Sequence, residues 1–240
     1  MTGLVVAMDG PSGSGKSSVS RGVARALGLR YLDTGAMYRA MTWWMLRQGV
    51  DLADPAAIAA RSGEPLIVSG TDPGGPTIHV DGVDVGGPIR EGDVTGAVSV
   101  VAAVPEVRAR LVALQREIAG AGDIVIEGRD IGTVVCPDAA VKVYLTASAE
   151  ARAQRRSAEL AGSTVEAQQA AMAKRDTLDA TRKTDPLSMA DGAVELDTTA
   201  LNLEEVIAAV LRLVAERRSS AGEGQTGESR SGRDRIHERT

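Results

Sequence analysis

The sequence feature that most constrains the fold is a glycine-rich segment at residues 10–17, Gly-Pro-Ser-Gly-Ser-Gly-Lys-Ser. It matches the pattern G-x-x-x-x-G-K-[ST] in full. A short apolar run at residues 4–8 precedes it, and residues 17–27 follow it with apolar side chains at helical spacing. A buried strand, a glycine-rich loop and a helix in this order predict a loop that wraps the phosphates of a nucleoside triphosphate.

This phosphate loop also predicts a role for each of its side chains. Its glycines let consecutive backbone N–H groups point at the phosphates. We expect Lys16 to reach the β- and γ-phosphates and the Ser17 hydroxyl to bind Mg²⁺ that accompanies ATP. The residues expected to bind the nucleotide are Gly10, Pro11, Ser12, Gly13, Ser14, Gly15, Lys16, Ser17 and Ser18.

Two carboxylates lie where strands are predicted to end, Asp9 after the first strand and Glu127 after a later one. A carboxylate at such a position either supports Mg²⁺ through a water molecule or serves the structure alone. The sequence leaves both interpretations open.

The rest of the chain predicts an α/β P-loop fold of three layers around a central parallel sheet. Further strands are expected at residues 30–32, 124–126, 141–145 and 194–196, with helices at 36–46, 105–119 and 203–214 and an arginine-rich helical stretch at 152–182. Turn signals at 71–76 and 81–82 predict a small antiparallel insertion over about residues 63–93. We expect one domain over residues 1–216 and a disordered tail over 217–240, where apolar residues are almost absent.

Composition excludes some classes of partner. The net charge of −5 argues against a nucleic-acid partner. No apolar stretch is long enough to span a membrane, and the N-terminus predicts a strand rather than a signal peptide. The single cysteine, Cys136, is expected to be a small core side chain in a reducing compartment. We therefore expect a cytoplasmic protein, a monomer with small-molecule partners.

Arginines downstream of the loop favour a second anionic substrate. Arg39 and Arg129 each follow a predicted strand, and Arg175 and Arg182 lie in the later helical region. The guanidinium fork suits phosphate oxygens, which it binds in pairs. No Asn-Lys-x-Asp motif selects guanine, which argues against a GTPase. For Arg152, Arg155 and Arg156 a solvated helix face is an equally good interpretation.

Two other functions remain open at this point. A small kinase for a hydroxyl acceptor, such as shikimate, would need a base, and Asp33 is a candidate. A regulatory module that binds ATP and signals by its shape would not need the arginine set. The long insertion and the run from Asp33 to Arg39 argue against the first alternative.

Four segments in order resemble the bacterial cytidylate kinase family. They are D-G-P-S-G-S-G-K-S at residues 9–17, L-D-T-G-A-M-Y-R at 32–39, E-G-R-D-I-G-T-V-V at 127–135 and R-D-x-x-D-x-x-R at 175–182. The resemblance runs over about residues 4–213. It implies transfer of the γ-phosphoryl group of ATP to CMP or dCMP. It further implies that the insertion is the CMP-binding domain and that a mobile helical lid covers about residues 150–172.

The same resemblance implies roles for individual residues. It places Lys16, Arg129, Arg155 and Arg182 in catalysis. Around the acceptor phosphate it implies Thr34, Arg39, Arg129 and Arg182, with Tyr38 on the same side. For cytosine it implies Ser99, Arg108 and Asp130, for the ribose Arg175 and Asp179, and for the ATP phosphates Arg152, Arg155 and Arg156.

Two of these roles have structural alternatives. Asp130 suits cytosine because a carboxylate accepts from its amino group, which uracil lacks. The alternative for Asp130 is a structural salt bridge to a neighbouring arginine. Ser99 could equally be a buried helix hydroxyl that bonds its own backbone.

Overall fold

The centre of the molecule is a five-stranded parallel sheet. The computed structural model describes residues 3–159 and 164–226. The strands follow the order β2-β6-β1-β7-β8. All four neighbouring pairs are parallel, which confirms the expected central sheet. Their bounds are β1 (Val5–Asp9), β2 (Arg30–Asp33), β6 (Ile124–Glu127), β7 (Val141–Thr146) and β8 (Val194–Asp197).

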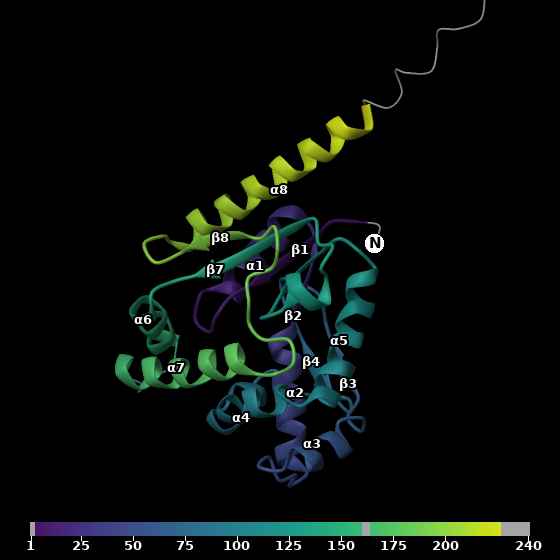
Figure 1. The fold of residues 1–240 in the computed structure, drawn as a ribbon, viewed down its shortest axis with the longest axis vertical. Helices are drawn as coiled ribbons and strands as arrows, with labels where there is room; N and C mark the ends of the chain where they lie inside the picture. The colour runs from purple at the N-terminus through teal and green to yellow at the C-terminus, as the bar shows by residue number, and fades with distance from the viewer. Residues whose placement is uncertain (1–2, 160–163, 227–240) are drawn as a thin grey trace, which may run out of the picture.

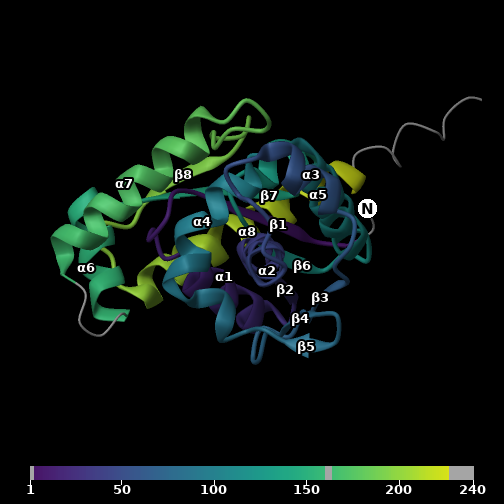
Figure 2. The ribbon, with the colours of Figure 1, turned by 90° about the horizontal axis from the view of Figure 1, so that it is seen from below.

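Helices cover both faces of this sheet and complete the three layers (Figures 1 and 2). Because side chains alternate along a strand, Val6 and Met8 face one side of the sheet and Val5 and Ala7 face the other. The first side packs against α1 (Lys16–Leu27) and α8 (Leu203–Thr226). The second packs against α2 (Thr34–Arg47) and α5 (Pro105–Gly120), where the buried Cys136 also lies.

Local signals in the sequence set several helix ends. Gly28 follows α1 in the left-handed conformation, with φ 65°, as a terminating glycine does. The Asp33 carboxylate accepts from the backbone N–H of Ala36, 2.8 Å away, and so caps α2. Pro105 begins α5, and the Ser148 hydroxyl accepts from Ala151 N in the first turn of α6 (Ala149–Glu159).

The insertion is the expected antiparallel sheet, with the order β3-β4-β5. Its strands are β3 (Ile67–Ser69), β4 (Ile78–Val80) and β5 (Val83–Asp84), and left-handed Asp81 and Gly82 form the β4–β5 turn. The short helix α3 (Pro55–Arg61) precedes it and α4 (Gly92–Ala102) follows it. The sequence did not predict α3, because Ile58 is the one buried residue in its seven and leaves no apolar period.

The arginine-rich stretch expected as one helical region forms two helices, α6 and α7 (Val165–Thr181). They pack against each other beside the sheet, at the left of Figure 1. Thr164 caps α7, since its hydroxyl accepts from Ala167 N at 3.2 Å. The link between the two helices, residues 160–163, lies outside the described residues.

The C-terminal helix α8 is longer than expected. It continues to Thr226, so the expectation of disorder is not met for residues 217–226. Residues 227–240 of the expected tail lie outside the described part of the chain.

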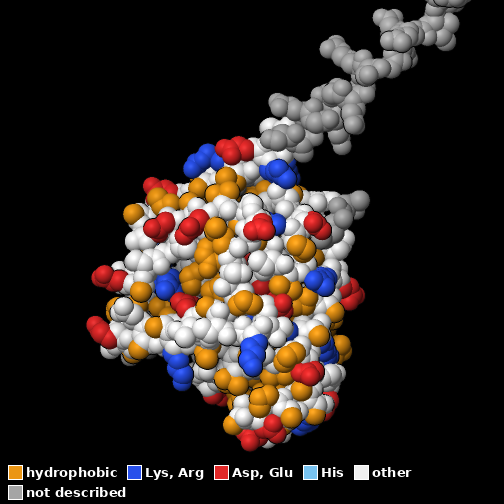
Figure 3. All heavy atoms as spheres, viewed as in Figure 1, with side chains coloured by type: hydrophobic (Ala, Val, Ile, Leu, Met, Phe, Trp, Pro, Cys, Tyr) orange, Lys and Arg blue, Asp and Glu red, His pale blue; other side chains and the backbone are white. Residues whose placement is uncertain are grey.

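The surface gives no strong patch of one charge on the face drawn in Figure 3, where acidic and basic side chains are interspersed. Within residues 3–159 and 164–226, no helix combines the length and the apolar character needed to cross a membrane.

Candidate active site

A cavity of about 610 Å³ opens at the carboxyl ends of β1, β2 and β6, where ligands bind in open α/β sheets. The P-loop follows β1, helix α2 begins directly after β2, and residues 128–130 follow β6. Helices α4, α6 and α7 complete the wall. The predicted residues that line it are Ser12, Gly13, Ser14, Gly15, Lys16, Ser17, Ser18, Thr34, Tyr38, Arg39, Ser99, Arg129, Asp130, Arg155, Arg156, Arg175, Asp179 and Arg182.

Four predicted residues do not line this cavity: Gly10, Pro11, Arg108 and Arg152. Gly10 lies beneath it, and a Cβ there would stand 2.1 Å from the carbonyl oxygen of Leu145. Its φ of 144° also disfavours any other residue. Gly10 thus lets the P-loop cross β7 at close range, and Pro11 supplies a carbonyl to Lys16.

The Lys16 ammonium is held inside the P-loop. Its Nζ donates to the carbonyl of Pro11 at 2.6 Å and to Ser14 Oγ at 3.3 Å. Burial lowers the pKa of Lys16, and the positive charge of Arg129 lowers it further. An anionic phosphate at this position would relieve both effects, so the environment of Lys16 favours an anionic ligand.

The Ser17 hydroxyl points at the end of β6, where Glu127 Oε2 accepts from it at 3.0 Å. The Tyr31 hydroxyl donates to the other oxygen of the same carboxylate. Burial raises the pKa of Glu127, and the charge of Asp33 raises it further. A hydroxyl and a carboxylate side by side are hard oxygen ligands, the type that Mg²⁺ takes beside substrate phosphates. The residues present therefore fit an ion bound with ATP.

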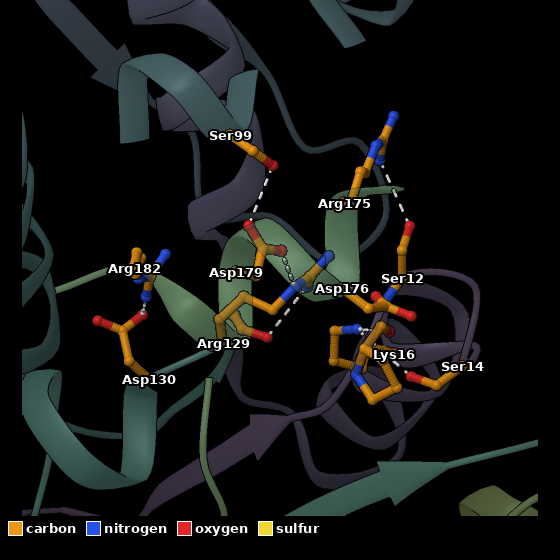
Figure 4. A network of polar contacts seen from close by, with 12 residues as sticks. Ser12, Ser14, Lys16, Ser99, Arg129, Asp130, Arg175, Asp176, Asp179 and Arg182 are labelled. Atoms are coloured by element: carbon orange, nitrogen blue, oxygen red, sulfur yellow. Dashed lines mark hydrogen bonds and ion pairs between the residues drawn. The ribbon is translucent and has the colours of Figure 1, made fainter. Parts of the chain in front are cut away.

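On the opposite wall, the carboxylate of Asp179 joins two predicted residues (Figure 4). Ser99 Oγ donates to its Oδ1 at 3.0 Å, and Arg129 Nε pairs with its Oδ2 at 3.0 Å. Ser99 thus bonds Asp179 rather than its own backbone, and this bond places its hydroxyl at the wall of the cavity.

Guanidinium groups converge on the cavity closely enough to repel one another. Arg175 reaches the P-loop, with Nη1 3.3 Å from Ser12 Oγ. Burial and then the charges of Arg129, Arg156 and Arg39 lower the pKa of Arg175 to about 10. Such a concentration of positive charge favours a polyanion.

Asp130 lines the cavity and also forms ion pairs. Its Oδ2 pairs with Arg108, and its Oδ1 lies 3.5 Å from Arg182 Nη2. The structural salt bridge expected as the alternative role of Asp130 is therefore present. Asp130 also lines the cavity, as contact with a cytosine base would require. Arg108 lies directly behind Asp130, 1% exposed, with its guanidinium over the ring of Tyr38.

The start of α2 presents a further set of polar groups. The Thr34 hydroxyl donates to the carbonyl of Glu127 at 2.7 Å. Arg39 Nη2 pairs with Asp33 at 3.1 Å, and its buried Nε has no hydrogen-bond partner among the described residues. Asp33, the candidate base for a hydroxyl acceptor, is occupied twice, by the cap of α2 and by Arg39.

Two of the three arginines of α6 are not a solvated face. Arg152 Nη1 donates to the carbonyl of Ser12 at 2.9 Å and pairs with Asp176, which itself accepts from Ser12 N. Arg152 thus fastens α6 to the P-loop rather than facing the cavity. Arg155 lines the cavity and donates to Thr198 Oγ1 at 2.9 Å.

Sequence reasoning missed the wall beyond the P-loop. There the cavity is lined by Val19, Thr198, Leu201, Asn202, Leu203 and Val206. Most of these follow β8 or begin α8, in a segment without a motif that would have singled it out. Only the closure of the fold brings them beside the P-loop.

Comparison with known proteins gives a consistent family. A family model described as Cytidylate kinase matches residues 6–216. A cytidylate kinase of Streptomyces coelicolor is 63% identical over 218 residues, which cover 90% of this chain and 94% of that protein. One from Mycobacterium leprae is 51% identical over 222 residues, covering 90% of this chain and 98% of that protein.

Among solved structures, an uncharacterized protein from Eubacterium ventriosum matches the fold with a TM-score of 0.50 at 9% identity. The match covers 89% of this chain and 98% of that chain, and at this identity it shows the fold alone. The family model and the curated relatives carry the assignment: the chain belongs to the cytidylate kinase family.

Proposed function

We propose that this protein transfers the γ-phosphoryl group of ATP to CMP or dCMP, which yields ADP and CDP or dCDP. The observation that carries the proposal is a single cavity that joins the P-loop to a second set of phosphate-binding groups. That set contains Arg39, Arg129, Arg175 and Arg182. Membership of the cytidylate kinase family supports the choice of acceptor.

The chemistry requires positioning more than proton transfer. An oxygen of the acceptor phosphate forms a bond to the γ-phosphorus as the bond from that phosphorus to the bridging oxygen of ADP breaks. The acceptor is already anionic, so no general base is needed. Repulsion between the two polyanions is the main obstacle, and Lys16, Arg129, Arg155 and Arg182 would offset it while they hold the phosphates in line.

Distinct walls of the cavity would hold the two substrates. We assign the ATP phosphates to residues 10–18 with Arg155 and Arg156, and the acceptor phosphate to Arg39, Arg129 and Arg182 with Thr34 and Tyr38 nearby. Asp130 would accept from the cytosine amino group, with Arg108 behind it. Ser99, bonded to Asp179, would contact the base from another wall. Arg175 and Asp179 would hold the ribose. Arg152 acts in this scheme by fastening the lid to Ser12.

Mg²⁺ bound with ATP would neutralise charge on the β- and γ-phosphates. We assign Ser17 as its protein ligand, with Glu127 placed to accept from a water of its shell. Within residues 3–159 and 164–226 no cluster of three or more His, Cys, Asp or Glu forms a cage of its own. Mg²⁺ usually keeps several waters and is bound through few protein groups plus substrate phosphates rather than by an all-protein cage.

We also propose that the insertion at about residues 63–93 and the lid at about 150–172 move relative to the sheet during turnover. A contact of the lid with the P-loop supports this, because Arg152 bonds the Ser12 carbonyl and would shift when ATP enters.

An acceptor panel tests the function. Purified protein with Mg²⁺ and ATP is assayed for ADP release with CMP, dCMP, UMP, shikimate or no acceptor. We expect release with CMP or dCMP and little with UMP, shikimate or no acceptor. Release with shikimate would favour the hydroxyl-acceptor kinase. Release without any acceptor, or with none of the monophosphates, would contradict the proposal.

A further inference from the structure

Asp185, in the turn after α7, has a left-handed backbone conformation. Its φ is 49°, in the left-handed region that residues other than glycine seldom adopt. Such conformations persist where the surrounding contacts hold them, often beside functional groups. Asp185 does not line the cavity, so its contacts indicate what the turn does.

Those contacts join two arginines of the acceptor side. The Asp185 carboxylate accepts from Arg108 Nε at 2.8 Å. Its backbone carbonyl accepts from Arg182 Nε at 2.6 Å. Two positions further on, Leu187 N donates to the carbonyl of Asp179 at 2.8 Å. The turn therefore wraps the end of α7 and fastens it to α5 behind the cavity.

Arg108 donates to two different carboxylates, and this affects the orientation of Asp130. Nε and Nη2 of a guanidinium lie on one edge, and that edge binds a single carboxylate bidentately when it can. Here Nε pairs with Asp185 and Nη2 with Asp130, so the edge is shared between two carboxylates. Asp130 keeps one oxygen directed at Arg182 and the cavity.

Without the Asp185 carboxylate, Nε of Arg108 would be a buried donor without a partner, which is costly. Arg108 is 1% exposed, and its Nη1 already has no hydrogen-bond partner among the described residues. The carboxylate already beside Arg108 can satisfy this donor if Asp130 rotates so that both its oxygens face the guanidinium. That rotation would withdraw Asp130 from the cavity.

We propose that Asp185 is a positioning residue for selection of the base, which acts by holding Arg108 so that the Asp130 carboxylate stays directed into the cavity. This rests on the proposed function, in which Asp130 accepts from the cytosine amino group. The left-handed turn is what brings the Asp185 carboxylate and carbonyl to two different arginines.

The test compares kcat/KM for CMP and UMP, and KM for ATP, in Asp185→Gly. Glycine keeps the backbone conformation and removes the carboxylate. We expect the preference for CMP over UMP to fall about tenfold, mainly through a higher KM for CMP, with KM for ATP unchanged. Asp123→Gly is the matched control, because Asp123 has φ 46° and its carboxylate bonds Leu4 N at the far end of the sheet.

Asp185→Asn keeps one acceptor oxygen and the tolerance for left-handed φ, so it tests the proposal even if the glycine variant fails to fold. We expect about a threefold fall in the preference for CMP. The mechanism also predicts that Asp185→Gly has no further effect on the preference in an Asp130→Asn background, since it acts through Asp130.

A folded Asp185 variant with the wild-type preference, or an equal fall in the Asp130→Asn background, would overturn the inference. A wild-type protein that does not phosphorylate CMP would instead contradict the proposed function, before any variant is compared.

Discussion

The hydroxyl of Ser17 lies 3.0 Å from Oε2 of Glu127 and donates to it, so the first turn of α1 is bonded directly to the end of β6. The Tyr31 hydroxyl donates to the second oxygen of this buried carboxylate. A carboxylate held at both oxygens has one orientation, and here that orientation faces the proposed Mg²⁺ ligand.

Tyr31→Phe should weaken this arrangement without emptying the core. The buried carboxylate loses one donor, which should cost about 1–2 kcal/mol in the free energy of unfolding. We also expect the Mg²⁺ concentration for half-maximal activity to rise, with KM for CMP unchanged. Urea denaturation and a Mg²⁺ titration at saturating ATP measure the two effects. An unchanged Mg²⁺ requirement in a destabilised variant would limit Tyr31 to a structural role.

Asp130→Asn should relax the choice between CMP and UMP. If the amide oxygen takes the place of Oδ2 beside Arg108, the amide N–H₂ faces the cavity, where it can donate to the carbonyl that uracil has in place of the amino group. We expect the preference for CMP over UMP to fall about tenfold or more, which corresponds to the loss of about one hydrogen bond to the base. We expect KM for ATP to stay within about twofold of the wild-type value. Steady-state kinetics with both acceptors decide it, and an unchanged preference would mean that Asp130 does not read the base.

Asp130→Ala should relax the preference as well, at a larger cost in stability. It leaves Arg108 buried with one of its two carboxylate partners gone. Removing one partner of a buried pair commonly costs about 3–5 kcal/mol, and the pairing that remains with Asp185 should reduce that figure. Equal thermal stability of the Ala and Asn variants would contradict this account of Arg108.

The free energy of unfolding should depend on pH through the titration of Asp9. Its carboxylate accepts from Ile131 N and Gly132 N, yet burial raises its pKa from 3.8 to about 6. The folded state therefore binds the proton of the Asp9 carboxyl more tightly than the unfolded state does. The stabilisation that this proton gives to the folded state is complete below about pH 4 and is lost as the pH rises through about 6.

Comparison with Asp9→Asn isolates that contribution, since the other titrating groups are shared. The stability of the wild type relative to the variant should fall between about pH 4 and pH 6, by at most about 1.4 kcal/mol per pH unit, and then level off. Urea denaturation across this range measures it. A difference that rises with pH in this window would show that the Asp9 pKa is lowered instead.

Removal of residues 220–240 should leave activity intact. Among the α8 side chains that the structure describes, the last buried one against the sheet is Val214, so the shortened helix keeps Val206, Val210 and Val214. We expect kcat within about twofold of the wild type. Val210→Asp in the full chain is the contrast, because it places a charge in that buried face and should lower stability strongly. A large fall in kcat on truncation alone would give the removed segment a role in turnover.

Local patterns in the sequence predicted the parts that local physics determines. The P-loop between β1 and α1 and the Asp81-Gly82 turn depend on neighbouring residues and were predicted correctly. The sequence did not predict the full length of α8 or the existence of α3. The last part of α8 and the whole of α3 lack the periodic apolar residues that mark a helix in the sequence.

Much of the site depends on residues far apart in sequence. The family resemblance implied roles for Asp179 and Ser99, but their bond to each other joins α7 to α4 and was not predicted. The partners of Arg108 illustrate the limit, since Asp185 lies 77 positions away in a turn with no motif. Likewise, nothing in the sequence distinguishes Tyr31 from an ordinary strand residue. The pairing of β2 with β6 brings its hydroxyl to Glu127.

The most direct test of the account is the stoichiometry of products from one equivalent each of ATP and CMP in the presence of Mg²⁺. Chromatographic separation of the nucleotides measures ADP and CDP together over the time course. A cavity that aligns the γ-phosphate with the acceptor phosphate predicts equal amounts of ADP and CDP and no inorganic phosphate. ADP with free phosphate and no CDP, or no consumption of CMP, would contradict it.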